Sequence, residues 1–231
     1  YALGTLPLSA AGRPTVAGFG WTIGLAIAVA VITSIVMRGG LLTYRIVFRR
    51  QLLVLLLPAI GLVVGGLAIA FAQATGKSVN EVLFSGQDQL PGLIGQAGTW
   101  SLAALTWLIV FKCIAYGLSL GSFRGGPTFP ALFLGAAGGI MASHLPGFPI
   151  QPAIAVGMGA AIVGVLRLPL SAVVLATLLT SHAGSNVEPL IIVGVVVSYI
   201  VTLLLSRSPK PMPAAAPHAA PTPALAPTSS R

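Results

Sequence analysis

The sequence contains very few charged residues, and this scarcity indicates the environment in which the chain folds. Charged residues make up 6% of the 231 residues, whereas apolar residues make up 56% and the mean hydropathy is +0.99. A soluble globular domain carries roughly 25% charged residues. A water-soluble fold is therefore excluded, and the composition predicts an integral membrane protein with several membrane-spanning segments.

Acidic residues are the scarcest charged group, since three Asp and Glu stand against twelve Lys and Arg and the net charge is +9. The basic residues lie between apolar runs and in the tail, not on one face with stacking aromatics, so no nucleic-acid partner is expected. Glu81, Asp88 and Glu188 lie in or next to expected loops. No buried carboxylate is therefore expected to serve as a proton relay.

Cysteines and catalytic groupings are also nearly absent. The single cysteine, Cys113, allows no internal disulfide, and neither CxxC nor Cys/His metal spacing occurs. The apolar region contains no Ser/His/Asp set and no paired carboxylates. The sequence therefore predicts no enzyme activity, no metal and no cofactor.

Three regions divide the chain. Residues 1–14 are a short polar lead-in that begins at Tyr1 without a Met or a signal peptide, so we expect a truncation point there. Residues 15–206 contain the apolar runs and are expected to form a transmembrane domain. Residues 207–231 are rich in Pro and Ala and are expected to form a disordered cytoplasmic tail.

The long uncharged runs predict membrane spans, because about 20 apolar residues cross a bilayer. The runs are 15–37, 51–76, 99–111 with its continuation, and 189–205. Four arginines at 38–50 predict a cytoplasmic loop, and Arg207 and Lys210 predict a cytoplasmic C-terminus. The polar residues 77–98 are then an outer loop. We expect a multi-pass protein of a bacterial plasma membrane.

Shorter apolar segments follow between Arg124 and Arg167 and just beyond, where Gly and Pro interrupt the chain repeatedly. The segments are 130–144, 152–166 and 169–180, and each is too short to span easily. Such broken segments are typical of half-helices that build a transporter or channel site.

The stretch Lys112–Pro130 contains a glycine-rich bend between two apolar segments. Glycines let the backbone approach a ligand closely, and the helix after the bend offers free N–H groups and the positive end of its dipole. Such a helix start is a natural anion site. Broken backbone at bilayer depth persists only where it lines a cavity or a site.

Several residues have more than one interpretation. Lys112 either extends to the membrane interface or lies near an ion path, and both remain open. Arg167 is interpreted as an interfacial anchor or helix-end partner, not as a pore residue. Gly157, Gly159 and Gly164 are interpreted as positions of close helix packing.

Two motifs occur in order along the chain. The first motif is carried by Lys112, Gly121, Ser122, Gly125, Gly126 and Pro130. The second is carried by Gly157, Met158, Ala160, Arg167, Pro169, Leu170 and Ser171. Together they resemble the motifs of the CLC family of chloride channels and proton-coupled chloride transporters. The resemblance covers residues 15–206 and corresponds to the C-terminal half of the membrane domain of the family.

The resemblance implies an all-α membrane fold with re-entrant half-helices, one half of an inverted repeat. It also implies a homodimer in the lipid bilayer with an anion pathway in each subunit. Its anion-binding turn corresponds to Gly125, Gly126, Thr128, Phe129 and Pro130. The chain departs from the family at Pro127, which has no N–H, so one anion donor is missing.

Three functions stay open at this point. The first is channel-like chloride conduction within a longer protein of the CLC type. The second is proton-coupled anion exchange, which is less favoured because no proton-carrying carboxylate is visible. The third is an unrelated multi-pass transporter or membrane scaffold in which the glycines serve packing alone.

Overall fold

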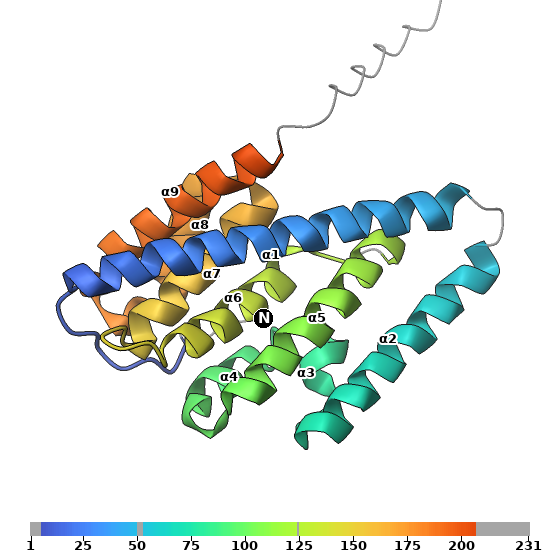
Figure 1. The fold of residues 1–231 in the computed structure, drawn as a ribbon, viewed down its shortest axis with the longest axis horizontal. Helices are drawn as coiled ribbons and strands as arrows, with labels where there is room; N and C mark the ends of the chain where they lie inside the picture. Colours follow the sequence, from blue (N-terminus) through green and yellow to red (C-terminus); the bar gives the residue numbers. More distant parts are fainter. Residues whose placement is uncertain (1–5, 50–52, 124, 207–231) are drawn as a thin grey trace, which may run out of the picture.

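The computed structural model describes residues 6–49, 53–123 and 125–206 (Figure 1). Within them, helices are joined by short turns and no strand occurs, which confirms the all-α prediction. The predicted tail at 207–231 lies outside the described residues. The α-helices are α1 (Val16–Arg49), α2 (Leu53–Thr75), α3 (Asn80–Leu83), α4 (Leu90–Gly95), α5 (Leu102–Ser122), α6 (Thr128–Ala142), α7 (Ile150–Leu166), α8 (Pro169–Leu179) and α9 (Glu188–Leu205). Three short 3-10 turns are η1 (Ala97–Thr99), η2 (Ser181–Ala183) and η3 (Ser185–Val187).

Apart from the very short α3 and α4, the described helices form a long group and a short group, as the apolar runs predict. In α1, α2, α5 and α9, the apolar stretch is long enough to cross a membrane. The helices α6, α7 and α8 have 15, 17 and 11 residues and lie where the three short segments were expected. The chain is therefore an all-α membrane protein with both spanning and short apolar helices.

The arginine-rich stretch is not the loop that the sequence predicts. In its described part, the helix α1 continues through Arg38 and Arg45 and ends at Arg49. Gly39 and Gly40 do not break the helix, because α5 packs against it there: a Cβ at Gly40 would lie 3.1 Å from Leu120. Tertiary packing outweighs the helix propensity of glycine, which is about 1 kcal/mol worse than that of alanine.

The polar stretch at 77–98 is also more ordered than predicted. It contains α3, α4 and the start of η1. Val82, Leu90 and Leu93 from this stretch are almost fully buried. Because these apolar side chains reach the core, the segment folds back against the helices and does not extend away from them.

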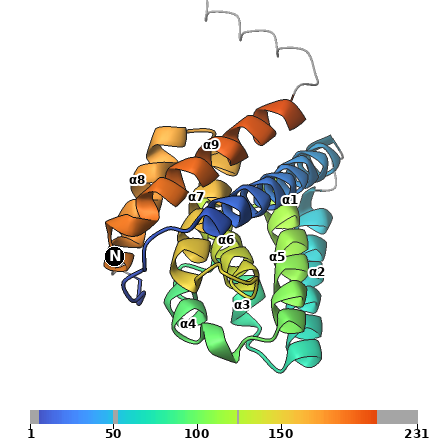
Figure 2. The ribbon, with the colours of Figure 1, turned by 60° about the vertical axis from the view of Figure 1, so that its left-hand side comes forward.

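The helices α6 and α7 form a pair at the centre of the molecule (Figures 1 and 2). The helices α1 and α5 pack against one side of this pair, and α9 packs against another side. The two backbones nearly touch, since a Cβ at Gly157 would collide with the carbonyl of Gly135. A Cβ at Gly159 would lie 2.9 Å from Val195 of α9, and one at Gly164 would collide with Thr33 of α1. The interpretation of these glycines as packing positions is confirmed.

Two arginines meet the C-terminal end of α9. The Arg167 guanidinium donates to the Ser206 hydroxyl oxygen at 2.9 Å, and Arg38 donates to the carbonyl of Leu205. Cations are favourable there because the helix dipole is negative at its C-terminal end. Arg167 itself ends α7 in a left-handed conformation with φ 58°. It is therefore a helix-end partner, as predicted.

Candidate functional site

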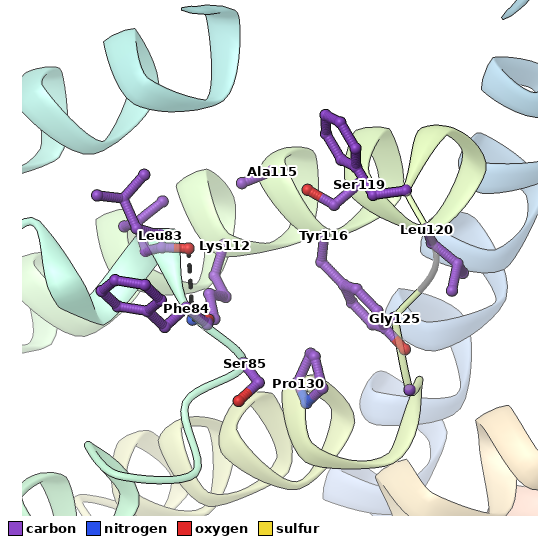
Figure 3. Close-up of a pocket in the computed structure, with 13 residues that line it drawn as sticks. Leu83, Phe84, Ser85, Lys112, Ala115, Tyr116, Ser119, Leu120, Gly125 and Pro130 are labelled. Carbon is purple, nitrogen blue, oxygen red and sulfur yellow. Dashed lines mark hydrogen bonds between the residues drawn. The ribbon is translucent and has the colours of Figure 1, made fainter. Parts of the chain in front are cut away.

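A pocket of about 180 Å³ lies between α5, the segment that follows α3, and the turn that precedes α6 (Figure 3). Lys112 and the hydroxyl-bearing Tyr116 and Ser119 line it from α5, and Ser85 lines it from the opposite segment. Apart from these groups, its walls are mostly apolar side chains and glycine backbone. The pocket therefore has one ammonium group and several hydroxyl groups in an otherwise apolar wall.

The structure brings three of the five predicted site residues to this pocket. Gly125, Gly126 and Pro130 line it. Thr128 and Phe129 are half-buried in the first turn of α6 and do not line it. Within the described residues, no backbone acceptor outside α6 takes the N–H of Thr128 or Phe129. The helix start therefore presents two N–H donors beside the pocket.

Pro127 is the residue immediately before α6, with φ −78° and ψ −14°. Its carbonyl accepts a hydrogen bond of 2.7 Å from the Tyr116 hydroxyl. This bond ties the turn to α5 and fixes where the N-terminus of α6 begins. Sequence reasoning missed Tyr116, although it lies four residues after Lys112 and hence on the same helix face.

Lys112 is buried, with 1% of its surface exposed, and does not extend to an interface. Its ammonium donates to the carbonyls of Glu81 at 2.6 Å and Phe84 at 2.5 Å, with Val82 farther away at 3.4 Å. It also lies 4.7 Å from the ring centre of Phe133. A buried ammonium needs such partners. The interface interpretation of Lys112 is therefore wrong, and its role near an ion path stays a prediction.

Glu81 is half-buried, so its carboxyl is more enclosed than its place in an expected loop suggests. Its Oε2 atom is buried and has no hydrogen-bond partner within the described part of the chain. Glu81 lies on α3, outside the spanning helices. Burial raises the pKa of its carboxyl above the ordinary value, and the nearby charges of Lys112 and Lys77 lower it by less. The sequence does not predict this burial, because Glu81 lies in a polar stretch.

Another buried polar atom without a partner among the described residues is a hydroxyl close to the turn. Ser122 is the last residue of α5, and its Oγ is buried with no hydrogen-bond partner among the described residues. It belongs to the Gly-Ser pair of the first motif. Buried polar groups are nearly always bonded, so this hydroxyl is available to a further group.

The family model for the voltage-gated chloride channel matches residues 3–203, which includes the pocket and both motifs. The chain belongs to the voltage-gated chloride channel (CLC) family. Comparisons with curated proteins and with solved structures gave no match. The family consists of channels and transporters that carry chloride across membranes, and it is not a family of enzymes. Chloride is accordingly the permeant ion for which the pocket is considered as a binding site.

Proposed function

We propose that this CLC chain forms part of a transmembrane chloride pathway, in which the turn at 125–130 holds the anion and chloride flows by channel-like conduction. Gly125 and Gly126 bring the backbone to the pocket, Thr128 and Phe129 supply N–H donors, and Pro130 closes the wall. Proton-coupled exchange is the alternative within the same family. The scaffold alternative is dropped because the chain belongs to a chloride-carrying family.

The observation that carries this proposal is that α6 begins at a pocket that also contains a buried ammonium. The helix has 15 residues, so it is too short to span easily, and its N-terminus adjoins the pocket. Its free N–H groups and positive dipole end favour an anion. Lys112 adds a full positive charge in the same wall. Both features support chloride over a cation.

The assembly and location that we propose are a homodimer in the lipid bilayer of a bacterial plasma membrane. Large apolar side chains are exposed on α8, among them Leu170 and Leu178, and on α9, among them Val196 and Ile200. An exposed apolar surface of this kind is compatible with contact with lipid or with a second copy. These exposed apolar faces support the proposal.

Pro127→Ile tests the anion-binding role of the turn. The substitution adds the N–H that proline lacks at the residue before α6, and its backbone angles are accessible to isoleucine. A hydrogen bond to a charged group contributes about 1.5–3 kcal/mol. Chloride affinity of the full-length protein, measured by calorimetry, should therefore rise about tenfold or more.

Pro91→Ile is the matched control, because Pro91 lies in the first turn of α4, is exposed and does not line the pocket. It should leave chloride affinity unchanged. If Pro127→Ile folds normally and binds chloride no more tightly than the wild type, the turn does not hold the anion. The assignment of this site would then be withdrawn.

A further inference from the structure

We propose that the Glu81 carboxyl is a proton-binding site and that its protonation strengthens anion binding in the adjacent pocket. This inference rests on the proposed function of the pocket as a chloride site. It assigns a role to a residue that neither of the two family motifs contains.

The structure links Glu81 to the pocket through Lys112. The Lys112 ammonium donates to the backbone carbonyl of Glu81 at 2.6 Å and also lines the pocket. The next residue in the chain, Val82, lines the pocket as well. The Glu81 carboxylate does not itself line the pocket or pair with Lys112, but a change of its charge acts on the ammonium that lines the pocket.

The surroundings of Glu81 favour an exchangeable proton. Its Oε2 is buried without a hydrogen-bond partner among the described residues, and an ionised carboxylate in such a place is unfavourable. No salt bridge to Glu81 occurs within the described part of the chain, so nearby cations act at longer range. Protonation removes the cost of burying the charge.

Two cations act on Glu81 from the elements around it. α3 packs against α2 and α5, and the described part of α2 carries no charged residue. Lys112 comes from α5, and Lys77 comes from the segment between α2 and α3, where its ammonium lies 4.6 Å from the Trp100 ring centre. Burial outweighs both cations, so the pKa of Glu81 is raised.

The charge of Glu81 sets the field that an anion meets in the pocket. While Glu81 is ionised, its negative charge offsets the ammonium of Lys112. Once it is protonated, the positive charge acts on the anion unopposed. Even when water fully screens them, two unit charges a few ångströms apart change affinity by about threefold to tenfold. Chloride should therefore bind more tightly as pH falls through the raised pKa of Glu81.

The test compares chloride binding to full-length wild type and Glu81→Gln by calorimetry, at neutral pH and at an acidic pH close to the ordinary carboxyl pKa. Wild-type affinity should increase about threefold to tenfold on acidification. Glu81→Gln should bind at the tighter affinity at both pH values. Asp88→Asn is the matched control, since Asp88 is an exposed carboxyl in the same stretch, and it should keep the wild-type pH dependence.

A second measurement detects the protonation of Glu81 in the absence of chloride. Because the folded protein binds this proton more tightly than the unfolded chain, the melting temperature should rise as pH falls, and Glu81→Gln should lose that rise. If both the melting and the binding profiles of Glu81→Gln match those of the wild type, the proposal is overturned. If the melting profiles differ as expected but the wild type binds no chloride at any pH, then the chloride site fails and Glu81 remains a proton site without a link to anion binding.

Discussion

At the scale of single residues, Lys112 joins two parts of the chain that are distant in sequence. Its ammonium bonds to carbonyls of Glu81 and Phe84, which precede it by 31 and 28 positions. These carbonyls end the short helix α3, so the lysine both holds this helix in place and compensates the negative end of its dipole. The same group then faces the pocket, so stability and site charge depend on one side chain.

Replacing this lysine by methionine tests how much the anchoring contributes. Lys112→Met keeps the side-chain length but leaves the Glu81 and Phe84 carbonyls without their donor. Each unsatisfied buried acceptor costs about 1–3 kcal/mol, so we expect a loss of roughly 2–4 kcal/mol in the free energy of unfolding, measured by denaturant titration in detergent.

Lys77→Met is the control for loss of a cation in the same region. The Lys77 ammonium contacts the Trp100 ring, and such a contact contributes about 0.5–1 kcal/mol. Lys77→Met should therefore lose less free energy of unfolding than Lys112→Met. Equal unfolding free energies for Lys112→Met and the wild type would show that the buried bonds of Lys112 are not stabilising.

The sequence predicts the importance of Lys112 but not its partners. The first motif contains the lysine, whereas its acceptors are backbone carbonyls, which carry no sequence signal. The partial burial of Glu81 is not predicted for a related reason: the residue lies in a polar stretch that suggests an exposed loop. Its burial depends on α3 packing against α2 and α5, and only the folded chain shows that packing.

At the scale of helices, glycine determines how closely the central pair can approach. A Cβ at Gly135 would collide with the carbonyl of Gly157, and one at Gly139 would collide with the carbonyl of Ala153. The atoms met are backbone atoms, which cannot rotate away as a flexible side chain can. The crossing of α6 and α7 therefore requires the absence of side chains at these positions, and the pocket at the start of α6 depends on that crossing.

Gly135→Ala should destabilise the protein because the added methyl forces the two helices apart. Overpacking a tight core costs about 1–3 kcal/mol, sometimes more, and we expect a melting temperature in detergent that is lower by several degrees. Gly66→Ala is the matched control: it lies within α2, and a Cβ there meets nothing within 4 Å. It should be neutral or slightly stabilising, as alanine favours helix. Similar melting temperatures for the two variants would contradict this account of the α6–α7 contact.

The sequence predicts the short helices well and the continuation of α1 poorly, for physical reasons. Prolines precede or begin α6, α7 and α8, and a proline near the first turn marks a helix start. The pair Gly39-Gly40 looks like a helix end, but there the backbone lies against α5 and the helix continues. Local signals predict an element only when tertiary contacts agree with them.

At the scale of the whole molecule, the arginines gather toward one end of the helix assembly. Arg38 and Arg167 both bond to the C-terminal end of α9, and α1 continues from Arg38 to Arg49. From that end, α2 runs back along α5 toward α3 (Figure 1). With 23 residues it is about 34 Å long at 1.5 Å per residue, enough to reach the other face of a bilayer. The segment after α2 should therefore lie on the opposite side of the membrane from the arginines.

Because positively charged segments stay on the cytoplasmic side, we predict that residues 38–50 and the C-terminal tail are cytoplasmic and that residues 77–98 face outward. Ser78→Cys and Ser208→Cys, each introduced with Cys113→Ala, give one reactive thiol on each predicted side, although Ser208 lies outside the described residues. An impermeant maleimide should label Ser78→Cys in intact cells, and Ser208→Cys only after the membrane is opened. The Cys113→Ala protein alone should remain unlabelled. If both thiols react equally from outside, or only Ser208→Cys reacts, then the charge pattern does not set the orientation of this chain.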